Sequence, residues 1–229
     1  MTDRSGQLRR IYEEQVASRP LIALCETWQD EAGIDAAIWT VTDPVGGVAW
    51  SRGASGAYLR ATSVPNLNEF CRLVSDQRWV FAPNVFSNNT VLRRSVLEFE
   101  LKLTDVANID NANSFFGLTT GVGDDRTSNN IIGFALLADV FQSVTDLAVN
   151  ETTNTDFHSV TAEATWNKLV MDVYAGHVDF YINNNLVASH ITNLPDYPFY
   201  LNWYLDTEAG GAATIELGIV RVWHEDVYR

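Results

Sequence analysis

The stretch from Trp166 to His190, WNKLVMDVYAGHVDFYINNNLVASH, decides the fold class of this chain. Two runs in which apolar and polar residues alternate, 169–174 and 178–182, flank the turn residues Ala175-Gly176-His177. A third run, 186–190, follows a turn of asparagines at 183–185. A period of two is typical of a strand with one buried face, and short runs joined by tight turns are typical of antiparallel pairing. The stretch therefore predicts an antiparallel meander of three strands.

The same pattern continues through most of the chain. From Leu21 onward, clusters of Gly, Asn, Asp and Thr separate short apolar runs. Many short strands with polar turns are typical of an all-β sandwich or barrel, and we expect an antiparallel β-sandwich. The other strands that we expect are 22–27, 39–41, 57–61, 72–81, 95–104, 114–119, 131–138, 144–150, 155–157, 199–205 and 214–223.

Alternation also assigns the buried faces. In the run 95–103, the apolar residues Leu97, Phe99, Leu101 and Leu103 share one face, and Glu98, Glu100 and Lys102 share the other. In the last strand the apolar phase switches near Gly218, which predicts a β-bulge at that point.

The N-terminal segment has a different period. Its apolar residues recur at helical spacing between a possible cap at Ser5 and a stop at Pro20, which predicts an amphipathic helix over 5–18. The apolar stripe consists of Leu8, Ile11, Tyr12 and Val16. This stripe could pack on its own domain, lie in solvent, or dock on a partner subunit. We therefore divide the chain into an arm, 1–20, and one β domain, 21–229.

Composition excludes several classes of function. The net charge is −14, with 15 basic against 29 acidic residues and no basic stripe, so we expect no binding to nucleic acid or to an anionic membrane. The start of the chain lacks the apolar region of a secretory signal, and no apolar run is long enough to span a bilayer. Cys25 and Cys71 are expected to be reduced and buried, without a zinc site. No cofactor is expected.

Four segments resemble the concanavalin A-like jelly-roll domains of the laminarinase and laminin-G type. They are ETWQDEAGIDAAIWTV (26–41), SVLEFELKL with NSFFGLTTG (95–103 and 113–121), the meander 166–190, and ELGIVRVW (216–223). The resemblance extends over about residues 21–224 and implies a jelly-roll sandwich. Such domains serve as glycosidases, lectins, adhesion modules and virus structural proteins.

The short polar segment MTDRSGQLRRIYEEQ, joined directly to the β domain, is similar to the start of tailed-bacteriophage virion proteins. This resemblance implies a capsid decoration or other surface protein located in the virion. Its partners would then be other virion proteins, and it would form a homo-oligomer. We take this as the first expectation of function, with binding through protein–protein contacts and no enzymatic activity.

A glycosidase would need paired carboxylates. The laminarinase-like relatives place theirs along one strand, as Glu-x-Asp-x-x-Glu or Glu-x-Asp-x-Glu. Here Glu98 and Glu100 are followed by Lys102 and Leu103, so the pattern is incomplete and we expect no catalytic residue. A diverged glycoside hydrolase is the second alternative.

A carbohydrate-binding module is the first alternative. On the non-core face of the late strands, rings that can stack on a sugar alternate with groups that can accept its hydroxyl hydrogen bonds. These residues are Asp172, Tyr174, Asp179, Tyr181, Asn202, Tyr204 and Asp206. The same face could instead pack against a loop, a helix or a neighbouring subunit.

Metal binding is not expected. The segments 105–113 and 124–125 contain Asp and Asn residues that could hold calcium, but these are also ordinary turn residues, and neither segment matches an EF-hand. The four histidines have no mutual spacing that indicates a site.

Overall fold

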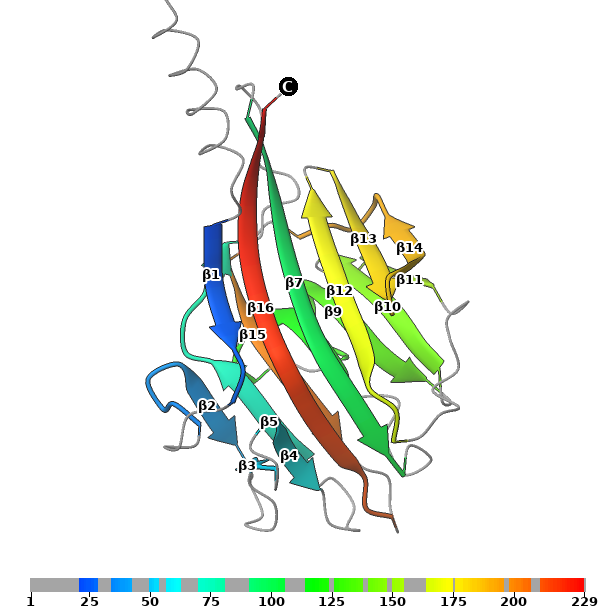
Figure 1. Ribbon diagram of the computed structural model, residues 1–229. Helices are drawn as coiled ribbons and strands as arrows, with labels where there is room; N and C mark the ends of the chain where they lie inside the picture. The colour runs from blue at the N-terminus through cyan, green and yellow to red at the C-terminus, as the bar shows by residue number, and fades with distance from the viewer. Residues whose placement is uncertain are drawn as a thin grey trace, which may run out of the picture.

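The computed structural model describes residues 21–28, 34–42, 50–53, 57–62, 70–80, 91–105, 114–123, 126–137, 140–147, 150–154, 164–174, 176–195, 198–206 and 211–228. Within these residues the chain folds into two antiparallel sheets packed face to face (Figure 1). The expected all-β antiparallel sandwich is confirmed. The expected arm, with its helix at 5–18, lies outside the described residues.

Sheet A forms the front layer in Figure 1. Its strand order is β14 (Asn185–His190), β13 (His177–Ile182), β12 (Asn167–Tyr174), β7 (Val91–Thr104), β16 (Thr214–Tyr228), β4 (Leu59–Thr62) and β3 (Ser51–Arg52). β1 (Leu21–Glu26) pairs with a different part of β16. The long strands β7 and β16 run side by side through the middle of the layer, so segments far apart in sequence share one surface.

Sheet B forms the rear layer. Its order is β11 (Asn150–Asn154), β10 (Val140–Leu147), β9 (Ile131–Leu137), β8 (Phe115–Thr119), β15 (Pro198–Asp206), β5 (Phe70–Ser75) and β2 (Trp39–Thr42), and β6 (Trp79–Val80) also pairs with β15. β15 follows the meander in sequence but belongs to the opposite sheet.

The expected strands are mostly observed, with differences at their ends. The expected strand 72–81 is two strands, β5 and β6, because the chain bends at residues 76 and 77 between them. The expected strand 144–150 is also divided, between β10 and β11. The short strand β3 was not expected from the sequence, and the expected strand 155–157 lies outside the described residues.

The meander is confirmed by its pairing. β12 pairs with β13 and β13 pairs with β14, both antiparallel. The second turn is tighter than expected, because Asn185 already belongs to β14. Asn183 and Asn184 have φ angles of 51° and 68°, the left-handed conformation that a two-residue hairpin turn requires and that asparagine tolerates.

The core lies between the sheets and contains a chain of aromatic rings. Phe99 of sheet A packs against Trp203 of sheet B with ring centroids 5.5 Å apart, and Phe180 of sheet A packs against Phe134 at 5.4 Å. Each such pair contributes about 0.5–1.5 kcal/mol beyond the burial of its area. The expected core faces of β7, β12 and β13 are confirmed as buried.

Sheet B also has a second apolar cluster, on its outer face. Phe115, Ile131, Ala135 and Val144 are buried and separate from the main core. The outer face of sheet B is therefore covered in this region, whereas the outer face of sheet A presents exposed charged side chains.

The expected bulge is confirmed. The register between β16 and β7 shifts between Leu217 and Val220, so that Gly218 and Ile219 on β16 lie opposite the single residue Glu100 on β7.

The two cysteines differ in exposure. Both are free thiols, but only Cys71 is buried, and the expectation that Cys25 is buried was wrong. Cys25 lies on β1, which pairs at the side of β16 and leaves the thiol exposed.

Candidate functional site

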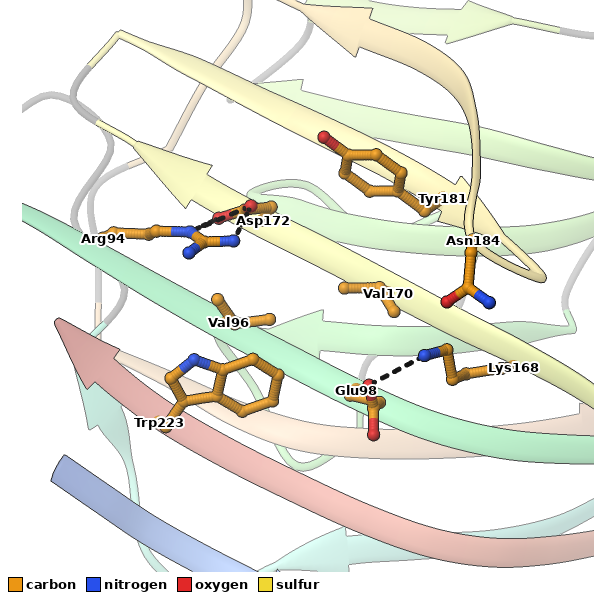
Figure 2. Close-up of a pocket in the computed structure, with 9 residues that line it drawn as sticks. All are labelled: Arg94, Val96, Glu98, Lys168, Val170, Asp172, Tyr181, Asn184 and Trp223. Atoms are coloured by element: carbon orange, nitrogen blue, oxygen red, sulfur yellow. Dashed lines mark hydrogen bonds and ion pairs between the residues drawn. The ribbon is translucent and has the colours of Figure 1, made fainter. Parts of the chain in front are cut away.

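A pocket of about 340 Å³ lies on the outer face of sheet A. Its lining comes from β7, β12, β13 and β16 and from the turn after β13. The lining residues are Arg94, Val96, Glu98, Lys168, Val170, Asp172, Tyr181, Asn184 and Trp223 (Figure 2). Strand alternation explains this set, because every second residue of β7 and β12 points away from the core.

The middle of the pocket is apolar and its ends are polar. Val96 and Val170, from the neighbouring strands β7 and β12, form the floor (Figure 2). Trp223 lies beside this floor on one side and Tyr181 on the other, because Trp223 pairs with Val96 and Tyr181 pairs with Val170. An apolar floor between two aromatic side chains can receive the apolar face of a ligand that also carries polar groups.

One polar end is fixed by a bidentate ion pair. The Arg94 guanidinium donates from Nε to Asp172 Oδ1 at 2.8 Å and from its terminal nitrogen to Oδ2 at 2.6 Å. The Tyr174 hydroxyl donates to the same Oδ2 at 3.0 Å. The Asp172 side chain is only 4% exposed, so these bonds hold a nearly buried carboxylate in place.

The other polar end is a second charge group. Glu98 accepts a hydrogen bond from Arg221 at 2.9 Å and lies 3.4 Å from the Lys168 ammonium. The Glu98 side chain is 14% exposed and the Lys168 side chain 34%, while the neighbouring Asn184 is exposed. This end therefore has accessible donors and an accessible acceptor beside the apolar floor.

The phenols of this face remain hydrogen-bond donors over a wide pH range. Burial raises the pKa of Tyr174 to about 12, with a further contribution from Asp172. Burial also raises the pKa of Tyr181, together with the negative charges of Asp179 and Asp172.

The residues that the sequence predicted to form one binding face lie on two different sheets. Asp172 and Tyr181 line the pocket, and Tyr174 and Asp179 lie beside it on β12 and β13. Asp179 is the direct cross-strand partner of Asp172.

Tyr204 and Asp206 do not belong to this face, and placing them with the others was wrong. They lie on β15, which the fold assigns to sheet B. Both are buried, and the Tyr204 hydroxyl donates to Asp206 at 3.3 Å while the Arg72 guanidinium stacks 4.4 Å from the Tyr204 ring. Their burial agrees with the alternative that this face packs against other parts of the structure rather than binding a glycan.

Six pocket residues were not identified from the sequence as site residues: Arg94, Val96, Lys168, Val170, Asn184 and Trp223. The alternation of β7 and β16 places Val96 and Trp223 on the polar face, and that pattern alone could have indicated them. Their proximity to β12 and β13 depends on strand order, which the sequence does not state.

The remaining expectations on binding groups concern metals and membranes. In the described part of the chain, no group of three or more His, Cys, Asp or Glu residues is placed to hold a metal ion. Most of the calcium candidates in 105–113 and 124–125 lie outside that part. The described residues also contain no helix with the length and hydropathy of a membrane span.

Comparison with known proteins gives matches of structure only. A scan against protein-family models finds no match, and neither does a search of curated protein sequences. The structure is similar to the catalytic domain of an endo-1,3-β-glucanase (laminarinase) from Thermotoga petrophila, at 11% identity and a TM-score of 0.61 over 91% of this chain and 99% of the other. It is similar to a Bacillus licheniformis β-glucanase at 13% identity and a TM-score of 0.57, over 90% and 98%. Peanut lectin matches at 9% identity and a TM-score of 0.63, over 93% and 100%.

These neighbours confirm the concanavalin A-like jelly roll. At such identities the likeness shows the fold alone. They give no support to a bacteriophage virion role. The homo-oligomer, the virion partners and the docking role of Leu8, Ile11, Tyr12 and Val16 stay predictions.

The expectation that the chain is not an enzyme is contradicted, because endo-glucanases are among its structural neighbours over nearly their whole length. That expectation was based on acids along a single strand, Glu98 and Glu100. A sheet also brings carboxylates of different strands together, as with Asp172 and Asp179, and a one-strand pattern does not detect such a pair.

Proposed function

We propose that this chain binds carbohydrate in the pocket on the outer face of sheet A. The observation that carries the proposal is the composition of the pocket, in which Trp223 and Tyr181 flank an apolar floor and hydrogen-bonding groups stand at both ends. A pyranose ring has an apolar face and a rim of hydroxyls, and this arrangement matches both. The glucanase and lectin neighbours support the proposal at the level of the fold.

The charges of this face favour a neutral glycan. The cations Arg60, Arg94, Lys102, Lys168 and Arg221 each contact a carboxylate of the same face. An anionic sugar would have to compete with these carboxylates and would approach a chain of net charge −14. A neutral glycan can instead donate hydroxyl hydrogen bonds to the paired carboxylates without displacing their partners.

The proposal is tested with purified chain on an array of neutral and anionic glycans, followed by calorimetry with laminarin and mixed-linkage β-glucan. We expect binding to neutral glycans, weakened about tenfold or more by Trp223→Ala and by Tyr181→Ala, because each change removes a stacking ring. Ile191→Ala is the matched control, since Ile191 is 73% exposed and does not line the pocket. Absence of binding to every neutral glycan, or binding that survives both substitutions, would refute the proposal.

Hydrolysis of the bound glycan is a second candidate function, and it is favoured by the Asp172–Asp179 pair. Directly opposed residues of an antiparallel pair have Cβ atoms about 4.5–5.5 Å apart. Carboxyl groups one bond beyond Cβ atoms at this spacing can take up the separation of about 5–5.5 Å that retaining glycosidases use. Binding is placed first because Arg94 engages both oxygens of Asp172, whose side chain is nearly buried.

This second function is tested by reducing-sugar release from laminarin and mixed-linkage β-glucan. Activity that Asp179→Asn and Asp172→Asn each abolish, with glycan binding retained in Asp179→Asn, would establish it. Activity unchanged in both variants would assign hydrolysis to other residues.

A further inference from the structure

A second aromatic group lies on the same face of sheet A, beyond the pocket. Trp166, just before β12, has 38% of its surface exposed, and its ring lies 5.8 Å from the ring of Tyr58 in an edge-on arrangement. Tyr58 comes just before β4, so the two rings approach each other across β7 and β16. The Lys102 ammonium lies 5.8 Å from the Trp166 ring centre, and the Arg60 guanidinium lies 5.8 Å from that of Tyr58.

Two glycines make room for these rings. A Cβ at Gly218 would lie 3.2 Å from the Trp166 ring and 2.9 Å from Glu100, so the indole lies over the bulge of β16. A Cβ at Gly53 would lie 2.0 Å from the Tyr58 ring, and the Gly53 N–H donates to the Tyr58 carbonyl at 2.8 Å. Each ring therefore packs against the backbone at a glycine, where the Cβ of any other residue would crowd the ring.

The aromatic pair continues the line of the pocket. Trp166 is two residues before Lys168, which lines the pocket, and both positions share the outward phase of this segment. Trp166 and Lys168 are separated by about 7 Å along the strand. Trp166 and Asp172, which lies at the far end of the pocket, are separated by about 20 Å. That length exceeds a single sugar ring and suits several rings in a row.

The polar surroundings of the pair resemble those of the pocket. Glu216 accepts from Arg60 Nε at 2.8 Å and lies 2.6 Å from the Lys102 ammonium. Burial alone would raise the pKa of Glu216, but the hydrogen bonds and charges of Lys102 and Arg60 outweigh it and lower the pKa. Glu216, Arg60 and Lys102 therefore form a charge-paired group at neutral pH, as the charged residues of the pocket do. The exposed Trp166 ring lies beside this group.

We infer that Trp166 and Tyr58 form a second sugar subsite, so that sheet A binds an extended neutral oligosaccharide across its outer face. This inference rests on the proposed carbohydrate function of the pocket. The ligand class is a linear neutral glycan long enough to contact Trp223 and Trp166 together, rather than a mono- or disaccharide. Affinity should consequently rise with chain length.

The test is calorimetry of the full chain with laminaribiose and laminarihexaose. The unsubstituted chain should bind the hexasaccharide at least about tenfold more tightly than the disaccharide. Trp166→Ala should remove most of that difference and leave disaccharide binding unchanged, whereas Trp166→Phe should retain much of it. Trp223→Ala should weaken both ligands. A thermal melt of Trp166→Ala close to that of the unsubstituted chain separates the loss of a contact from a loss of folding.

The outcomes distinguish this inference from the pocket proposal. If Trp223→Ala weakens both ligands and Trp166→Ala weakens neither, the pocket binds sugar and the second subsite is refuted. If Trp166→Ala weakens both ligands equally, Trp166 acts through the pocket and the second subsite is again refuted. If neither ligand binds the unsubstituted chain, both proposals fail for this glycan.

Discussion

Acid should destabilise this protein through His190, which lies between the two sheets. His190 is on β14 of sheet A, is 3% exposed, and packs 4.8 Å from the Phe180 ring. Its Nε2 lies 2.8 Å from the hydroxyl oxygen of Ser143 and its Nδ1 lies 3.0 Å from that of Thr145, both on β10 of sheet B. A neutral imidazole has one N–H and one unprotonated nitrogen, so one of the two hydroxyls accepts from the N–H and the other donates to the unprotonated nitrogen.

The magnitude follows from the pKa. Burial lowers the pKa of His190 from 6.5 to about 4. The unfolded chain therefore binds a proton that the folded chain refuses between pH 6.5 and 4, and folding stability falls as the pH falls through that window. The full difference corresponds to about 3 kcal/mol, and about 2.5 kcal/mol of it is lost by pH 4.5. A domain of this kind is stable by only about 5–15 kcal/mol, so the effect is measurable.

Guanidinium unfolding at pH 7.5, 6.5, 5.5 and 4.5 measures this loss as a change in the free energy of unfolding. The series stops at pH 4.5 because Glu216, whose pKa is lowered, begins to lose its own contribution below that value. His190→Leu should be less stable at pH 7.5, because it leaves two buried hydroxyls without the imidazole, but its stability should vary less with pH. His177→Asn is the matched control, since the His177 side chain is 37% exposed. Stability that stays constant from pH 6.5 to 4.5, or a pH dependence unchanged in His190→Leu, would refute the reasoning.

Three further outcomes are expected. Gly133→Ala should destabilise the domain by about 2–3 kcal/mol in denaturant unfolding, because its Cβ would lie 2.5 Å from the Phe115 ring and 2.6 Å from a backbone oxygen; a loss below about 0.5 kcal/mol would contradict this packing. Asn184→Gly should keep or slightly raise the melting temperature, since glycine adopts the φ of 68° freely, and it should lower glycan affinity because the amide is lost. A lower melting temperature with unchanged glycan affinity would contradict this prediction. A thiol reagent should label Cys25 at once and Cys71 only after unfolding, and equal labelling of both in the native state would disagree with the observed exposure.

Local pattern was sufficient for the secondary structure. The meander, the buried faces of β7, β12 and β13, and the bulge at Gly218 follow from alternation and turn residues within short windows. Strand ends were less accurate, since the expected strand 72–81 is divided by a bend and β3 consists of only two residues. Such details depend on which neighbour each backbone group finds in the sheet.

The candidate site was predicted only in part. Asp172 and Tyr181 were identified because they alternate outward on a segment whose strands are adjacent in sequence and in space. Tyr204 and Asp206 have the same local pattern but lie on the other sheet. Trp223 was missed as a pocket residue because its neighbour Val96 is more than a hundred residues away in sequence.

The sequence by itself determined that the chain forms antiparallel strands, which side of most strands is buried, and that residues 166–190 form a meander, because side-chain alternation and turn chemistry act between near neighbours. Only the tertiary structure decided which outward faces share a surface. Strand order joins β7 and β16 to the meander and sends β15 to the other sheet, so it assembles Trp223, Val96 and Tyr181 into one pocket. The physical reason is that an outward-facing side chain contributes little to the choice of strand order, which is set by burial of the opposite face.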